Sequence, residues 1–515
     1  MLGISSGLWG LTKGRELYGL VKKAYYSITH GIRFTQVDID SLTEFNDPFL
    51  KQGLSELKRF GVEFGIHGET LMTTQQYLML LESALEMYYK LSHERLIEHL
   101  KNLEELGAKY MVLHASEALP FQLLAREANP SRIVDPWGRP IRKLIEENPF
   151  LKKFIFSEND MVRKEIWDFL HVDPKRMIER EKIEIEQIYR MRIAATTDEK
   201  EKKQLEEKMK EELKEIENKI KNSLLSMTET SEFSYGPERF AYYVVAKYMQ
   251  ETSDRIWQRL VGRKLSDEEI ISSPEKWVPA VAIKYIQGHF NPKLKEYKDP
   301  KKYLEKSKIY LCFEAAPGPQ GYENLRRIFH PFHLYALAKF LDTPYAGWVL
   351  DFEHTLACGI DVKKAVEQLP EDGGKYLKVV HLAFPSPLHG HVPVPLGSEA
   401  QEYIYEVLYI LRQKGFTDGW LIYERGSEPI EQTIITMKKI KEFLEKNVEP
   451  RELPPEFYGF EVNAPEVVRQ EEIIKQHALD PLKGLLSVPE EEYTFLSRSA
   501  LERGRAEQWR KEEMK

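Results

Sequence analysis

Six short apolar segments of the sequence each end in a residue that can bind a metal ion. The clearest runs from Gly347 to Asp351, stops abruptly at an acid and is followed by His354. Carboxylates and imidazoles are common ligands of divalent metals in proteins. One such pair is weak evidence, because an aspartate at a strand end often caps the next helix. The pattern recurs, however, and the six terminal residues are His67, His114, Glu314, Asp351, His381 and Glu424.

The elements that must position these residues alternate along the chain. Apolar runs of four to eight residues bounded by glycine are typical of buried parallel strands. If one long interruption is set aside, the sequence contains about eight strand-then-helix units, which predict an α/β fold, the closed (β/α)8 TIM barrel. The C-terminal strand ends form one face of such a barrel and carry its active site. We therefore expect the six terminal residues to converge.

The interruption and the tail predict additions to this barrel. We assign residues 1–114 and 309–447 to the barrel, 115–308 to a helical insertion after the fourth strand, and 448–515 to a C-terminal extension. Apolar spacings of three and four predict a helical hairpin at about 175–225, with its turn at Ala194 to Asp198. Its charged outer faces suggest an antiparallel coiled coil, a dimerisation arm or a solvated hairpin packed on itself. The insertion leaves from the catalytic face and could cover the site.

Composition narrows the class of protein. The 515 residues are 30% charged and 42% hydrophobic, with two cysteines and many Lys and Glu residues, which fits a cytosolic protein of a thermophile. A net charge of −8 argues against a surface that coats nucleic acid, although a local basic cleft is compatible with it. The first residues lack the features of a signal peptide, and no run approaches the roughly 20 apolar residues of a membrane span. We expect a cytoplasmic protein with no membrane partner, which could form a homo-oligomer through the insertion.

The candidate ligands exceed the needs of one ion. His354, His389 and His391 join the six strand ends, and one ion takes three or four protein ligands, so two or three ions are expected. Clustered ions suit phosphate-ester hydrolysis, with Glu314 as the expected bridging carboxylate. Any single histidine could instead be a hydrogen-bonded core residue. His93 and His99 lie on a charged helical segment and are expected at the surface.

Three motifs resemble those of the xylose-isomerase-like barrels, most closely endonuclease IV (AP endonuclease family 2), a zinc-dependent family that cuts DNA at abasic sites. The segment Glu314-Ala-Ala-Pro-Gly-Pro-Gln-Gly321 is similar to the family's Glu-Asn-Thr-Ala-Gly-Gln-Gly. Asp351-Phe-Glu-His354 is similar to its Asp-Thr-Cys-His, and His389-Gly-His391 to its Asp-Arg-His. The resemblance covers the barrel and leaves out the insertion and the tail.

The resemblance implies a multinuclear site and a hydrolase. One zinc would be held by His67, His114 and Glu314, a second by Asp351, His381 and Glu424 with Glu314 bridging, and a third by His354 and His391. His389 replaces the family's aspartate, which changes the charge of the third site. The implied reaction is phosphodiester hydrolysis with zinc, or with manganese or magnesium. The partner would be a phosphate-containing small molecule or nucleic acid with a damaged site.

Two other functions are compatible with these residues. Sugar or sugar-phosphate isomerases and epimerases of the same superfamily bind a single Mn, Mg or Zn ion at the strand ends that correspond to Glu314, Asp351, His381 and Glu424. In them the two glutamates move a proton beside a carbonyl group, so Glu314 and Glu424 are the candidate catalytic residues. His67 and His114 favour the hydrolase, because a nitrogen-rich site suits zinc. The third alternative is a non-catalytic assembly protein that uses the helical arm.

Overall fold

The computed structural model describes residues 1–6, 19–29, 32–39, 42–68, 79–116, 132–228, 237–316, 327–383, 392–424 and 430–460. The chain divides into two compact units, Met1–Pro450 and Arg451–Lys515. Of the second unit, two short 3-10 turns are described, η8 (Pro450–Glu452), which starts at the boundary, and η9 (Pro455–Tyr458). His389, His391 and most of the predicted C-terminal extension lie outside the described residues.

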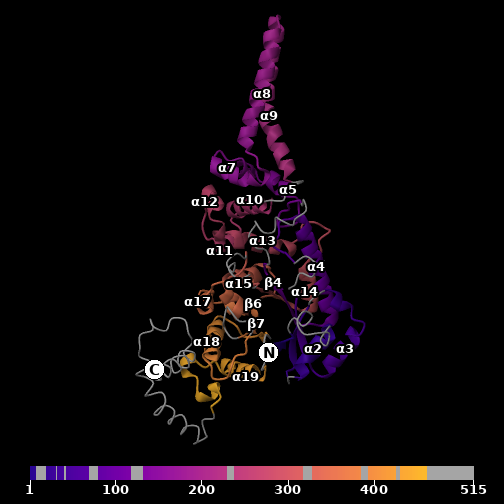
Figure 1. Ribbon diagram of the computed structural model, residues 1–515, viewed down its shortest axis with the longest axis vertical. Coiled ribbons are helices and arrows are strands. Elements are labelled where there is room, and N and C mark those ends of the chain that lie inside the picture. Colours follow the sequence, from indigo (N-terminus) through magenta and orange to yellow (C-terminus); the bar gives the residue numbers. More distant parts are fainter. Residues whose placement is uncertain are drawn as a thin grey trace, which may run out of the picture. The chain divides into compact units, whose positions relative to one another are not determined.

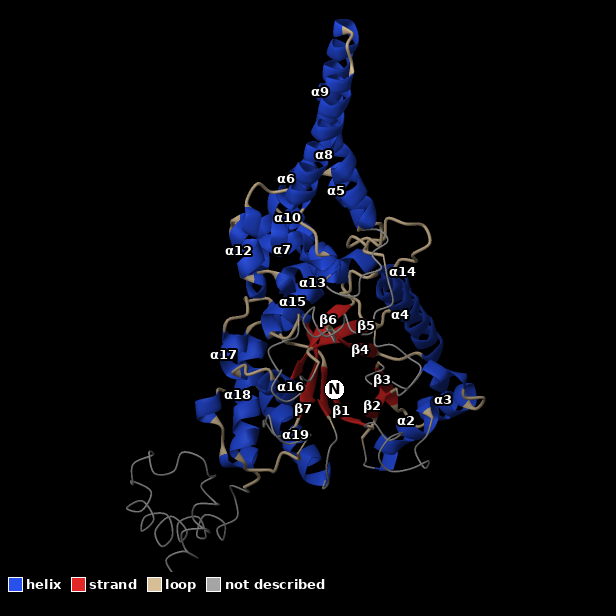
Figure 2. Ribbon diagram, turned by 45° about the horizontal axis from the view of Figure 1, so that its top comes forward, coloured by secondary structure: helices blue, strands red, loops and turns tan. Residues whose placement is uncertain are grey.

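Eight parallel strands close into a barrel in chain order (Figure 2). The first pairs with the eighth through Leu2 and Leu421, which closes the sheet. This confirms the predicted TIM barrel. The strands are β1 (Leu2–Ser5), β2 (Phe34–Asp38), β3 (Glu63–His67), β4 (Tyr110–His114), β5 (Tyr310–Glu314), β6 (Ala346–Asp351), β7 (Leu377–Leu382) and β8 (Trp420–Tyr423).

The strand register brings the predicted ligands side by side. His114 is the direct partner of Glu314 across β4 and β5, and Asp351 is the partner of His381 across β6 and β7. Beneath them the barrel is filled by side chains from β2 and from β4 to β8, so it has a packed interior. The buried cluster there consists of Phe34, Tyr110, Val112, Cys312, Val349, Val379 and Ile422.

Helices surround the strands in the first unit. Among them α4 ends at Gly107, whose left-handed backbone (φ 73°) lets its N–H donate to the carbonyl of Leu103. The 3-10 turns η2 (Leu42–Asn46) and η7 (Gly373–Tyr376) add to this layer. The helices are α2 (Leu20–Thr29), α3 (Leu50–Arg59), α4 (Glu86–Leu106), α14 (Pro300–Ser307), α15 (Pro331–Phe340), α16 (Phe352–Ala357), α17 (Val362–Glu367), α18 (Glu399–Gln413) and α19 (Ile430–Glu445).

Between β4 and β5 the described residues are largely helical. The fully buried Trp167, Trp257 and Trp277 give this region a core of its own. It also packs on the barrel layer, since α13 contacts α15 and α14 contacts α4. Besides α14 and the hairpin, its helices are α5 (Ile141–Glu147), α6 (Pro149–Ile155), α7 (Asp160–Trp167), α10 (Pro237–Glu251), α11 (Arg255–Leu260), α12 (Asp267–Ser272) and α13 (Val278–His289).

The predicted hairpin is formed by α8 (Pro174–Ala195) and α9 (Glu199–Met227), which run side by side away from the other helices (Figures 1 and 2). Asp198 begins α9, its carboxylate accepting from the N–H of Lys200 at 2.9 Å. The hairpin and its turn agree with the sequence analysis, whereas the coiled coil and the dimerisation arm remain predictions. In the described part of the chain, no helix combines the length and apolarity needed to cross a bilayer.

Two expectations for the α4 region are wrong. The sequence predicts a helix from about residue 75 to Leu106, but the described residues 79–85 are not helical and α4 begins at Glu86. Side chains take up backbone N–H groups before it; Ser92 Oγ, for example, accepts from the N–H of Leu80. His93 and His99 are buried and not exposed. The ring of His99 meets Phe45 of η2, and Nδ1 of His93 lies 3.1 Å from Nδ1 of His289 on α13. Neither packing partner can be read from the pattern of α4 alone.

Candidate metal centre

Seven of the nine predicted ligands come together at the C-terminal ends of the strands. Two groups have ligand atoms that lie within 4.8 Å of one another: His67, His114 and Glu314, and Glu314, Asp351, His381 and Glu424. Glu314 belongs to both groups. His354 lies beside them, with Nδ1 3.4 Å from Oε1 of Glu314. His389 and His391, the other two predicted ligands, are outside the described residues.

The four-residue group is centred on Nδ1 of His381. This nitrogen lies 2.7 Å from Oε1 of Glu314, 3.0 Å from Oε2 of Glu424 and 3.5 Å from Oδ2 of Asp351. The four side chains come from four consecutive strands or their ends, β5 to β8. Three carboxylates therefore face one ring nitrogen in a buried place.

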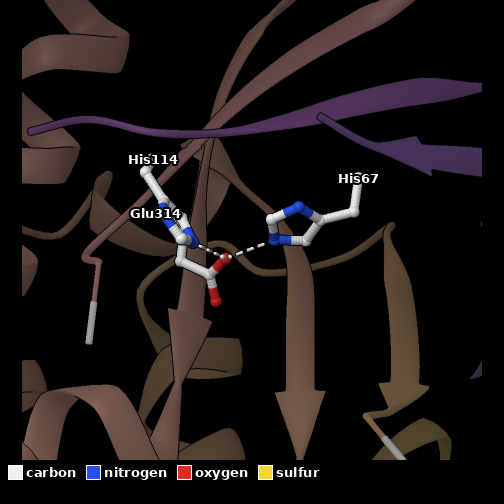
Figure 3. A group of neighbouring side chains, drawn as sticks. All are labelled: His67, His114 and Glu314. Carbon is white, nitrogen blue, oxygen red and sulfur yellow. Dashed lines mark hydrogen bonds and ion pairs between the residues drawn. The ribbon is translucent and has the colours of Figure 1, made fainter. Parts of the chain in front are cut away.

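The three-residue group uses the other oxygen of Glu314 (Figure 3). Oε2 lies 3.0 Å from Nε2 of His67 and 3.8 Å from Nε2 of His114, and Figure 3 shows both rings pointing at this carboxylate. Oε1 faces His381, as described above. The carboxylate of Glu314 thus lies between two ligand groups, the position expected of a bridging residue.

Asp351 has two roles that the sequence presented as alternatives. Its Oδ1 accepts from the N–H of His354 at 2.6 Å and caps α16, while its Oδ2 faces His381. The cap turns the chain directly after β6, so that His354 points back toward Glu314. Its Nδ1 also lies 3.0 Å from the carbonyl of Ala315. One aspartate both orients a histidine and contributes a carboxylate.

The hydrogen-bonding partners of His67 indicate that the site is built for a cation. Its Nδ1 lies 3.0 Å from the carbonyl oxygen of Gly68, which can only accept, so Nδ1 carries a hydrogen. In the neutral ring Nε2 then presents a lone pair to the carboxylate of Glu314 at 3.0 Å. Two acceptors at this distance need a proton or a metal ion between them. The residues therefore fit a divalent metal.

Without a metal, protons take that role. Burial alone would lower the pKa of His67, but the hydrogen bond and charge of Glu314 outweigh it and raise the pKa to about 9. Burial is likewise outweighed at His354, where Asp351 and Glu314 raise the pKa to about 10. Burial would raise the pKa of Glu314, yet His381, His354 and His67 hold it well below its usual value. Burial raises the pKa of Asp351, although His354 and His381 oppose this.

The two groups differ in the metal they suit. Three carboxylates and one imidazole make the four-residue group rich in oxygen, which favours Mn²⁺ or Mg²⁺, ions that commonly take six ligands. The three-residue group has two imidazoles and one carboxylate, the ligand number of catalytic zinc sites that keep one position open. Either ion would lie on buried, preorganised ligands.

Two further residues of the site, Gln36 and Asp38 on β2, were not predicted from the sequence. Asp38 is the last residue of β2 and pairs in register with His67. Its Oδ2 accepts from Ser5 Oγ at 2.9 Å, and burial raises its pKa although the nearby His67 lowers it. Gln36 lies one layer deeper and contacts His381. Asp38 obeys the same strand-end pattern as the predicted ligands, so that signal could have found it, whereas nothing in the sequence singles out Gln36.

A buried network fixes the segments around the site. The guanidinium of Arg327 donates to both oxygens of Glu238 on α10, at 2.6 and 3.2 Å, and to Tyr242 Oη at 2.9 Å. Glu238 also accepts from Ser83 Oγ, and the N–H of Arg327 contacts Ser116 Oγ, two residues beyond His114. Through Glu238 the network connects the region between β4 and β5 to Ser83, which precedes β4, and to Arg327, which follows β5.

Comparisons with known proteins add little to this. No protein-family model and no curated protein matches the chain. Among solved structures, the chain is similar to a D-tagatose 3-epimerase-like protein (12% identity, 87% of this chain and 97% of that one, TM-score 0.39). It is also similar to an IolI protein with a bound zinc atom (12%, 87% and 99%, 0.38) and an L-ribulose 3-epimerase (8%, 88% and 99%, 0.40). Similarities this distant carry no argument about the activity of this chain, and the resemblance to endonuclease IV remains a prediction.

Proposed function

We propose that the chain is a metal-dependent isomerase or epimerase that acts on a small hydroxy-carbonyl compound of the carbohydrate class. The observation that carries the proposal is the four-residue group, in which Glu314, Asp351 and Glu424 surround Nδ1 of His381. It combines a full set of ligands for one ion with two glutamates on β5 and directly after β8. This is the second of the functions derived from the sequence.

The four residues would hold one divalent ion, for which their oxygen-rich set favours manganese or magnesium. When bound, such an ion polarises the carbonyl and hydroxyl oxygens of a substrate. The protein holds two of these ligands in position, since Gln36 contacts His381 and Asp351 is fixed by the cap of α16. Little rearrangement of these side chains is needed, which favours catalysis by preorganisation.

The two glutamates would move the proton. A carboxylate of one glutamate takes a proton from the carbon beside the carbonyl, and the other glutamate returns a proton to the neighbouring or the same carbon. The side chain of Glu424 keeps 12% of its surface exposed, whereas that of Glu314 has none. Glu424 is therefore better placed to meet a substrate directly, with Glu314 as its partner.

Solvent exchange tests this proposal. The purified chain, supplied with Mn²⁺ or Mg²⁺, is incubated in D₂O with a panel of ketoses, aldoses and their phosphates. Proton NMR follows the signal of the hydrogen on the carbon beside the carbonyl. We expect loss of that signal with at least one substrate and no loss with Glu424→Gln. No exchange with any member of the panel under either metal would count against the proposal.

A second candidate function is phosphodiester hydrolysis, favoured by the three-residue group. His67 and His114 face Oε2 of Glu314 whereas His381 faces Oε1, which suits a second ion and a bridging carboxylate. Paired ions stabilise the attacking and leaving oxygens of phosphate esters. Release of nitrophenol from bis-nitrophenyl phosphate, or cleavage of DNA with an abasic site, would support it if His67→Ala abolished the reaction. Failure of both substrates with zinc-loaded protein would speak against it.

A further inference from the structure

The layer of the barrel beneath the ligands contains a glutamine whose side-chain amide contacts a ligand. The side chain of Gln36 is fully buried. Its Oε1 lies 3.0 Å from Nε2 of His381 and accepts at 3.0 Å from the hydroxyl of Tyr110. Its Nε2 donates to Oδ1 of Asp38 at 3.4 Å. Three polar groups on β2, β4 and β7 thus meet at one amide.

These contacts determine how the amide is oriented. The NH₂ group of the amide lies toward Oδ1 of Asp38, and its oxygen lies toward the hydroxyl of Tyr110. The oxygen of the amide then faces His381, and an amide oxygen can only accept. Nε2 of His381 must therefore carry a hydrogen, and in the neutral ring Nδ1 is left with its lone pair. That lone pair points at Glu314, Asp351 and Glu424.

We propose that Gln36 is a positioning residue that sets the tautomer and ring orientation of His381, so that Nδ1 is the atom presented to the metal. This rests on the four-residue group as a metal site and deepens the proposed function. Partners of this kind fix a ligating imidazole and raise its basicity. Gln36 itself touches neither ion nor substrate in this role.

The surroundings hold Gln36 in place. Tyr110 is fully buried, and its ring lies against β3 where Gly65 has no side chain; a Cβ there would lie 2.2 Å from Cζ of Tyr110. The glycine therefore makes room for the ring that delivers the hydroxyl to Gln36. The missing side chain of Gly65 on β3 thus leaves space beside the ring carbon that carries this hydroxyl.

The test compares three variants in the full-length protein. Gln36→Met removes the acceptor with little change of shape. Gln36→Glu keeps one carboxyl oxygen toward His381, even if the other oxygen, which faces Asp38, takes up a proton. Tyr110→Phe removes the other donor to the same oxygen and serves as the matched control. Mn²⁺ and Zn²⁺ affinities are measured by chelator competition, and the ring N–H of His381 is followed by ¹H–¹⁵N NMR of the zinc-loaded protein.

We expect Gln36→Met to weaken metal binding by about 10- to 100-fold and to move the Nε2–H resonance with faster solvent exchange. Gln36→Glu should restore most of both, and Tyr110→Phe should change affinity only slightly. Unchanged affinity and an unchanged Nε2–H signal in Gln36→Met would overturn the inference. Thermal melts of each variant check that it is folded. Rescue by Gln36→Glu is a second control, because a merely structural effect would not be rescued by this substitution. Absence of isomerase activity in the wild type, with these affinity changes intact, would refute the proposed function and leave the inference standing.

Discussion

The Nδ1 atom of His381 lies 2.7 Å from Oε1 of Glu314, although 67 positions separate the two residues in the chain. Both are fully buried at the C-terminal face of the barrel. The other oxygen of Glu314 faces His67. Because each oxygen of this buried carboxylate faces a histidine, Glu314 is the residue on which the centre depends.

Replacing Glu314 by glutamine should remove metal binding while leaving the barrel folded. The amide keeps the shape of the side chain but loses its negative charge. That charge attracts a cation, and it also raises the pKa of His67 against the effect of burial. We expect metal affinity to fall by at least about 100-fold, more than for an outer partner, and solvent exchange of substrate protons to stop. Metal analysis and activity would be measured together with far-UV circular dichroism. Wild-type turnover in this variant would refute the assignment.

Metal binding should release protons. In the metal-free protein the pKa of His67 is raised to about 9 and that of His354 to about 10, so both rings are protonated at neutral pH. An ion must displace such protons, and its apparent affinity should therefore rise with pH until these values are passed. The stability that these raised pKa values give the metal-free protein is present below about pH 6.5 and is lost as pH rises through 9 to 10. Calorimetric titrations in two buffers with different ionisation enthalpies should yield different heats; equal heats would contradict this prediction.

Two substitutions of Asp351 should separate its two roles. Asparagine can still accept from the N–H of His354 but lacks the carboxylate charge, whereas alanine loses both. We expect both variants to bind metal more weakly. In the metal-free protein, Asp351→Ala alone should lose about 1 kcal/mol of unfolding free energy, the usual effect of losing an N-cap. Denaturant unfolding checks this, and equal destabilisation by the two variants would show that the cap contributes nothing.

The pair of Arg327 and Glu238 should behave as a buried ion pair. Arg327→Met leaves the buried Glu238 without its cation, which should lower the unfolding free energy by about 3–5 kcal/mol. Burial would raise the pKa of Glu238, but Arg327 outweighs it and holds the pKa below its usual value. The double variant Arg327→Met with Glu238→Gln should therefore recover much of the loss. A double variant no more stable than Arg327→Met would indicate that the loss of stability comes from the changed shape of the side chain and not from the unpaired charge.

Acid should destabilise the contact between α4 and α13. Burial lowers the pKa of His93 to about 4, and burial together with His93 lowers the pKa of His289 well below its usual value. Both rings are neutral in the folded protein, so the stability they support is present above about pH 6.5 and is lost as pH falls toward 4. Thermal midpoints measured from pH 7 to pH 4 should fall less steeply for His93→Gln than for the wild type. Parallel curves would exclude this pair as the cause.

The strands and most ligands were predictable because both follow local rules. Buried parallel strands are short apolar runs, and the TIM barrel brings their C-terminal ends to one face, so His67 and Glu424 could be placed there without coordinates. Asp38 follows the same rule and was overlooked because its strand alternates polar and apolar residues. The strand ends therefore carry most of the information about the site.

The rest depends on contacts between distant segments. The late start of α4 arises from side chains that bind the backbone before it, and the burial of His93 arises from packing against His289 of α13. Gln36 could not be recognised because its importance lies in its contact with His381, 345 positions away. Which oxygen of Glu314 faces which histidine is likewise a property of the closed barrel, not of any motif.

The metal content per chain tests whether the four-residue group holds an ion. Native mass spectrometry and elemental analysis would compare the wild type, His67→Ala with His114→Ala, and His381→Ala, each after exposure to manganese and zinc. We expect the variant without His67 and His114 to keep one ion and His381→Ala to lose it. An ion that survives in His381→Ala but disappears with His67 and His114, or a wild type that binds none, would contradict this expectation.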